Sequence, residues 1–226
     1  MNRIFCEKII YDLSRERLEP YGRDGASDSL IMARYLWNIA TCESLYSSIH
    51  LAEVSLRNSI HKQLTEFTQR PDWYESLNLI SGWQLEEITY AKINITRKRK
   101  VVTPGRMVAE LRFGFWTGFF NKVHAKSGLG HKLAAAVFPY APRVERDMRK
   151  IDYRWTRIRE LRNRVFHHER IIHWNDLDLQ FETLLESINW ISPDLYLINR
   201  RINHFKDIRQ SGVGPWVKLI SEIGDG

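Results

Sequence analysis

The chain has 226 residues, of which 43% are hydrophobic and 27% are charged, and this balance is typical of a globular protein with one sizeable core. Glycine and proline are too few for a fibrous or disordered class. The two cysteines, Cys6 and Cys42, give no basis for a disulfide framework and favour a reducing, cytoplasmic setting. The formal net charge of +7 favours a polyanionic partner, nucleic acid ahead of an acidic membrane surface.

Apolar residues recur in steps of three and four along most of the chain, and this spacing predicts helices. The stripe from Ile31 to Phe67 is the longest and predicts either one long bundle helix or two helices with a kink. The expected helices span residues 2–18, 28–67, 82–99, 104–122, 130–138, 142–167, 175–190 and 194–209, and a short last turn is expected at 216–223. No segment shows convincing period-two alternation, so we predict one all-α domain over residues 1–226 with helix-bundle packing.

The segment 111–120 is apolar nearly all round, so we expect it to be buried. Gly114 and Gly118 each cost about 1 kcal/mol of helix propensity relative to alanine. Both glycines are explained if another helix approaches closely there. The cysteines are also expected in the core.

The membrane is not an expected partner. No apolar run approaches the roughly 18 residues of a transmembrane helix. Charged residues interrupt the N-terminal segment too early for a signal peptide. We therefore expect a cytoplasmic protein.

The segment from Arg143 to Arg164 carries nine basic and four acidic residues, a net charge of +5 on one predicted helix. One interpretation is a solvated helix face with ion pairs, such as Glu145 with Arg149. The other is a surface that binds a polyanion.

The sequence from Leu161 to Arg170, LRNRVFHHER, lies at the end of this basic segment. On a regular helix Asn163 and His167 are neighbours one turn apart, with Arg159 in the same row, and Arg162 shares a face with Glu169. Arg162 and His167 are about 140° apart. Their side chains can then meet only through a bent arginine, a frayed helix end, or a second subunit across a two-fold axis.

The residue types in this stretch fit metal-free RNA cleavage. RNA carries its own nucleophile, the 2′-hydroxyl. A histidine can move that proton near neutral pH, and an arginine can bind the phosphate and stabilise developing charge. Asn163 can hold the imidazole or donate to the phosphate. The structural alternative is a basic pair at a helix C-terminus, favoured by the helix dipole.

Three stretches carry a resemblance to a known family: RNRVFHHE at 162–169, EVSLRNSI at 53–60 and FGFW at 113–116. Together they resemble the Abi-like (abortive phage infection) proteins of the HEPN superfamily, over roughly residues 30–190. The resemblance implies an all-α HEPN-like helical bundle with additional N-terminal and C-terminal helices. It implies a homodimer with a composite cleft, and metal-independent endoribonuclease activity with no cofactor.

The resemblance also assigns roles. Arg162 and His167 match the catalytic arginine and histidine, and Asn163 matches the polar position after the arginine. Phe166 stands where a small residue is commoner. The implied biology is phage defence by a toxin that cripples translation and is often restrained by a partner, so an antitoxin of protein or RNA is expected.

Further residues are expected to bind RNA or support the catalytic pair: Arg159, Arg164, His168, Glu169, Arg57 and Glu53. Glu53 and Arg57 are alternatively a simple ion pair at the edge of the apolar stripe. No metal site is expected, because His167 and His168 point about 100° apart on a helix and no recognised ligand spacing is completed. Two other functions remain open, a non-catalytic RNA-binding module and a protein-interaction scaffold.

Overall fold

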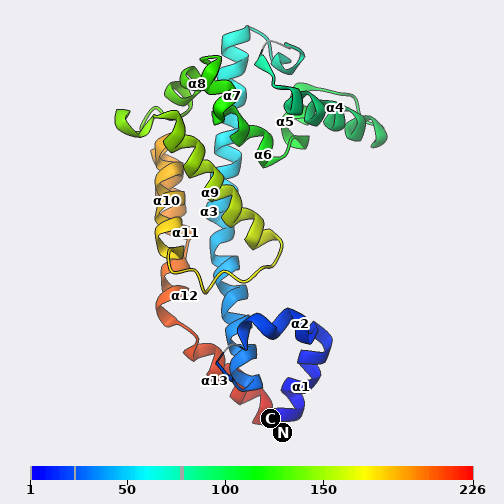
Figure 1. Ribbon diagram of the computed structural model, residues 1–226, viewed down its shortest axis with the longest axis vertical. Helices are drawn as coiled ribbons and strands as arrows, with labels where there is room; N and C mark the ends of the chain where they lie inside the picture. Colours follow the sequence, from blue (N-terminus) through cyan, green and yellow to red (C-terminus); the bar gives the residue numbers. More distant parts are fainter. Residues whose placement is uncertain (1, 23, 77–78, 226) are drawn as a thin grey trace. The chain divides into compact units, whose positions relative to one another are not determined.

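The computed structural model describes residues 2–22, 24–76 and 79–225, and the side chains of 7–22, 24–76 and 79–223. These ranges are helical and contain no strand (Figure 1), so the all-α prediction is confirmed. Apart from short 3-10 turns, the helices are α1 (Asn2–Leu13), α2 (Arg15–Leu18), α3 (Asp28–Thr68), α4 (Gly82–Arg97), α5 (Pro104–Glu110), α6 (Phe113–Thr117), α7 (Lys122–Lys126), α8 (Leu129–Val137), α9 (Met148–Phe166), α10 (Leu177–Ile191), α11 (Pro193–Ile202), α12 (Phe205–Ser211) and α13 (Gly214–Asp225).

The helices with the longest apolar stripes match their predicted ranges within one or two residues, and α3 is one continuous helix of 41 residues. Three predicted helices are interrupted by a short polar side chain. Ser14 adopts a φ of +67° and caps α2 by accepting from the amide of Arg17. Asn121 accepts from the amides that start α7, and Asn203 accepts from the amide of Phe205, which starts α12.

Other helix boundaries also differ from the predictions. The helix predicted over 104–122 is broken a first time at Leu111 and Arg112, which are extended. The basic helix begins at Met148 rather than 142, because Asp147 accepts from the amides of Arg149 and Lys150. The last helix is longer than expected, since Pro215 lies in its first turn, where a missing amide costs no hydrogen bond.

The chain divides into two compact units, and each is built from separated stretches of sequence. The first unit comprises residues 1–47, 162–181 and 202–226, and the second comprises 48–161 and 182–201. Helix α3 contributes its first half to the first unit and its second half to the second. The assignment of residues 1–226 to one domain stays a prediction.

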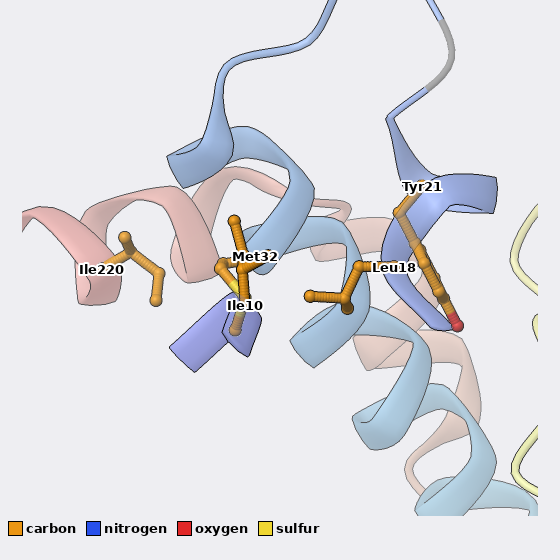
Figure 2. Packing of buried hydrophobic residues seen from close by; sticks show 5 residues of the cluster. All are labelled: Ile10, Leu18, Tyr21, Met32 and Ile220. Atoms are coloured by element: carbon orange, nitrogen blue, oxygen red, sulfur yellow. The ribbon is translucent and has the colours of Figure 1, made fainter. Parts of the chain in front are cut away.

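The core of the first unit includes a cluster of Ile10, Leu18, Tyr21, Met32 and Ile220 (Figure 2). These residues come from α1, α2 and the turn after it, α3 and α13. Helices α1 and α13 pack against each other (Figure 1), so the beginning and the end of the chain meet in this unit.

The core of the second unit is aromatic. The ring of Trp73 lies 6.0 to 6.2 Å from the rings of Phe115, Trp116 and Phe119. The segment 111–120 is buried as predicted except for exposed Arg112 and half-buried Gly114. A Cβ at Gly118 would lie 2.4 Å from the indole of Trp83 in α4, so a side chain from another helix does approach closely there. At Gly114 the nearest atom, from Arg159, lies at an ordinary 3.8 Å.

Candidate functional site

Residues 162–170 of the motif lie where α9 ends, in the first unit. His167 is the first residue beyond the helix, and its amide still donates to the carbonyl of Asn163 at 2.9 Å. His168 has a φ of +57°, and its amide donates to Val165 while the amide of Glu169 donates to Arg164. This is the hydrogen-bond pattern of a Schellman turn, in which glycine usually holds the left-handed position. Here that position is a histidine.

Three side chains fix the backbone of this turn and of the segment after it. Arg17 donates to the carbonyl of His168, and Arg170 donates to the carbonyl of Pro20. Asn38, only 2% exposed, makes the other contacts. Its amide nitrogen donates to the carbonyl of Glu169 at 3.2 Å, and its oxygen accepts from the amides of residues 171 and 172 at 2.8 and 3.3 Å.

Sequence reasoning missed this anchoring role of Asn38. The available signal was a carboxamide in the apolar stripe of α3, between Tyr35 and Cys42. A buried amide needs hydrogen-bond partners, and here they are backbone groups that follow the motif.

Arg162 contacts its own neighbours on α9. Its guanidinium lies over the ring of Phe166, 4.6 Å from the centroid, and Nη1 donates to Oδ1 of Asn163 at 3.4 Å. Phe166, which departs from the resembled pattern, thus supports the arginine. Arg162 is half-buried, whereas Asn163 and His167 are exposed.

Two predicted pairings within the motif are not found in the described residues. The carboxamide of Asn163 contacts Arg162 rather than the imidazole of His167. Glu169 does not share a helix face with Arg162, because α9 ends three residues before it. The Glu169 carboxylate instead forms an ion pair with Arg164.

The other predicted RNA-binding or supporting residues, Arg159, Arg57 and Glu53, belong to the second unit. Nη1 of Arg159 donates to the hydroxyl of Thr117 at 3.2 Å. Arg57 and Glu53 form an ion pair at 2.8 Å, with side chains 18% and 15% exposed, so the expected pair at the edge of the stripe is confirmed. Their roles toward RNA stay predictions.

Ion pairs occupy part of the basic segment. The predicted partner of Glu145 is wrong, since its carboxylate lies 2.8 Å from Lys150 rather than against Arg149. Arg154 pairs with Glu186 and stacks on a tryptophan ring. The net charge of this helix is therefore partly compensated within the second unit.

A pocket of about 460 Å³ lies between α3 and the end of α9, within the first unit. Neither Arg162 nor His167 lines it. Its lining residues are Tyr35, Asn38, Ile39, Cys42, Glu43, Tyr46, Val165, Phe166 and His168.

Burial raises the pKa of the Cys42 thiol to about 11, so this cysteine stays protonated at neutral pH. Cys42 is half-buried at the pocket wall, and the side chain of Cys6 lies outside the described residues.

Within the described side chains, no group of three or more His, Cys, Asp or Glu residues could hold a metal ion. No helix in the same ranges is long and apolar enough to cross a membrane. Comparison of the chain with models of known protein families, with curated proteins and with solved structures finds no match.

Proposed function

We propose that this chain is a metal-independent endoribonuclease of the HEPN type that acts in phage defence as a toxin. The observation that carries the proposal is the end of α9, where half-buried Arg162 lies within the helix and exposed His167 lies in the fixed turn that ends it. Three sequence stretches that resemble Abi-like proteins support the same conclusion. The partner of such a toxin is an antitoxin of protein or RNA.

The chemistry follows from the residue types. The 2′-oxygen of one ribose attacks the adjacent phosphorus and the bond to the 5′-oxygen breaks, giving a 2′,3′-cyclic phosphate and a 5′-hydroxyl end. His167 removes the proton from the 2′-hydroxyl or supplies one to the leaving 5′-oxygen. Arg162 binds the non-bridging oxygens and stabilises their charge. Asn163, in contact with Arg162, orients its guanidinium or donates to the same phosphate.

The direct test compares RNA cleavage by the wild type, His167→Ala and Arg162→Ala, with chelator present throughout. We expect His167→Ala to lose at least about 100-fold in rate, the low end for removal of a general acid or base. Arg162→Ala should also lose at least about 100-fold, the low end for removal of a group that stabilises charge in the transition state. The products should carry cyclic phosphate ends. Exposed residues of the second unit provide the matched controls His131→Gln and Arg201→Ala, which should cleave like the wild type. Equal cleavage by wild type and His167→Ala contradicts the proposal.

We further propose that the active form is a homodimer in which Arg162 and His167 act together across the two-fold axis. Co-expression of Arg162→Ala with His167→Ala tests this. Mixed dimers then hold one intact pair, so about one quarter of the wild-type activity should return. An intact pair within one subunit predicts no recovery.

A non-catalytic RNA-binding module is the second candidate, and the net charge of the segment 143–164 favours it. In that case RNA binds with an affinity that falls steeply with salt, because phosphate contacts dominate. Arg162→Ala and His167→Ala would then leave affinity and cell growth nearly unchanged. Induced expression of each variant, with growth and RNA integrity followed together, separates the two functions.

A further inference from the structure

The pocket between α3 and the end of α9 is not used by the proposed cleavage chemistry. Its volume of about 460 Å³ falls inside the range of roughly 300–1,000 Å³ usual for small-molecule sites. One wall is the stretch of α3 from Tyr35 to Tyr46, and the other is formed by Val165, Phe166 and His168. All of these residues belong to the first unit.

The outer part of this pocket is aromatic. The rings of Tyr46 and Phe166 lie 5.8 Å apart and are 54% and 40% exposed, respectively. Ile39, 46% exposed, also lines the pocket. Exposed aromatic faces are the surfaces on which single-stranded nucleic acids stack their bases.

Two polar side chains of the pocket are available to a ligand. Among the described residues, neither the Glu43 carboxylate nor the His168 imidazole has a hydrogen-bond or ion-pair partner. The amide of Asn38, in contrast, is engaged by the backbone after α9. An ionised carboxylate only accepts hydrogen bonds, so Glu43 is complementary to a ligand edge with adjacent N–H donors.

Guanine has such an edge. Its ring N1–H and its exocyclic amino group point the same way and can bind both oxygens of one carboxylate. Uracil has one N–H between two carbonyls, while adenine and cytosine place an amino group beside an acceptor nitrogen. The chemistry of Glu43 therefore selects guanine from the four RNA bases.

Phe166 connects this pocket to the candidate phosphate-binding residue. One side of its ring carries the guanidinium of Arg162, and the ring also lines the pocket beside Tyr46. A nucleotide likewise places its phosphate and its base on neighbouring positions of one ribose. A phosphate bound by Arg162 thus brings the attached base to the pocket.

We infer that this pocket binds the guanine base of a single-stranded RNA, next to the phosphate held by Arg162. Glu43 accepts from the guanine edge, and Tyr46 and Phe166 stack on the base. The inference rests on the proposed ribonuclease function and adds its substrate class, single-stranded RNA cut beside guanosine.

Binding is tested with full-length His167→Ala protein, so that the RNA stays intact. Fluorescence anisotropy would give the Kd for an oligoadenylate heptamer and for the same heptamer with one central guanosine. We expect the guanosine oligomer to bind about tenfold more tightly, the low end for hydrogen bonds to a charged group. Adding Glu43→Gln should remove this preference. Adding Tyr46→Leu should weaken binding of the guanosine oligomer by about tenfold, as loss of a stacking face does.

Exposed residues of α4 supply the controls, Glu86→Gln and Tyr90→Leu, which should bind like the parent protein. Circular dichroism would establish that all variants are folded. Free 5′-GMP should compete weakly and 5′-AMP should not compete. A Kd for 5′-GMP equal to that of the oligomer overturns the RNA assignment in favour of a mononucleotide. Equal affinity for the two oligomers overturns the guanine pocket.

The outcome is independent of the test of cleavage. If wild-type protein cuts RNA without regard to guanosine and binds both oligomers equally, the pocket inference fails while the ribonuclease stands. If the protein prefers guanosine but cuts nothing, the proposed function fails and the base-binding pocket stands.

Discussion

His168 combines a left-handed backbone with a side chain that lines the pocket. Residues other than glycine lose roughly 1–2 kcal/mol in this conformation, although histidine tolerates it better than most. A glycine would be the ordinary choice at this position of the turn. This histidine is thus a residue-scale departure from the local optimum, and its side chain lines the pocket.

Replacing His168 by glycine tests this point. The substitution removes the strain but increases the entropy of the unfolded chain, for a net stabilisation of about 0.5–1 kcal/mol. For a chain of this size that is a rise in Tm of about 1–4 °C. Scanning calorimetry of His168→Gly and His168→Ala would measure the change in Tm. A lower Tm for the glycine variant would contradict the expected stabilisation.

At the scale of elements, one buried side chain of α3 holds the segment that follows α9. Asn38→Ala removes three hydrogen bonds and leaves two amides and a carbonyl unpaired, a cost of about 2–3 kcal/mol. The amides of Ile171 and Ile172 should then exchange with deuterium much faster. Hydrogen-exchange mass spectrometry measures this directly. Asn58→Ala, an exposed change on the same helix, should leave the exchange of these amides unaltered.

The two glycines of segment 113–118 form a matched pair. A methyl group at Gly118 would meet the indole of Trp83, so Gly118→Ala should destabilise the fold by about 1–3 kcal/mol through overpacking. At Gly114 the nearest atoms leave room, and Gly114→Ala should be neutral or stabilising by up to about 1 kcal/mol. Urea unfolding would measure the change in the free energy of unfolding for both variants. Equal changes would contradict the close contact at Gly118.

Long apolar periodicity allowed α3, α4, α8 and α10 to be predicted from sequence, because burial of a stripe determines where such helices run. The interruptions at Ser14, Asn121 and Asn203 were missed. Each depends on one short side chain that binds a nearby backbone amide in place of the helical hydrogen bond. Residue type allows such a cap, but only the surrounding packing determines whether it forms.

The candidate site likewise has features that local sequence predicts and others that depend on tertiary packing. The sequence located Arg162, Asn163 and His167 at the end of the basic helix, since helix periodicity and residue chemistry are local properties. It did not reveal the anchor at Asn38, because that residue lies 133 positions from the amide it binds. Contacts at such separation are set by tertiary folding and leave only the weak signal of an amide in an apolar stripe.

At the scale of the whole molecule, one buried and one half-buried histidine contribute to how stability responds to acid. His124 is 3% exposed, and its Nε2 forms a hydrogen bond with Oε1 of Gln84 at 2.6 Å. Burial lowers the pKa of this histidine below the ordinary 6.5. Burial also lowers the pKa of His61, whose Nδ1 accepts from the indole of Trp73. Below pH 6.5 the unfolded chain therefore binds protons that the native chain excludes.

The contribution of these two histidines to the free energy of unfolding should be fully present above pH 6.5. As the pH is lowered, the free energy of unfolding should fall by at most about 1.4 kcal/mol per pH unit for each histidine. Urea unfolding at pH 7.5 and 5.5 measures the loss. His124→Gln should reduce this pH dependence, whereas the exposed change His131→Gln should not. An identical loss in His124→Gln and wild type would show that His124 is not responsible.

The stretches of sequence that form the first unit are synthesised at different times. Its three stretches come from the beginning, the later middle and the end of the chain, and α1 is paired with α13. Ribosomes make chains from the N-terminus at about 5–20 residues per second. The first half of α3 is therefore made before residues 162–181 and 202–226, with which it forms this unit. The groups that hold the turn after α9, on Arg17, Pro20 and Asn38, are made before the turn itself, so the turn can form before residues 202–226 of the same unit exist.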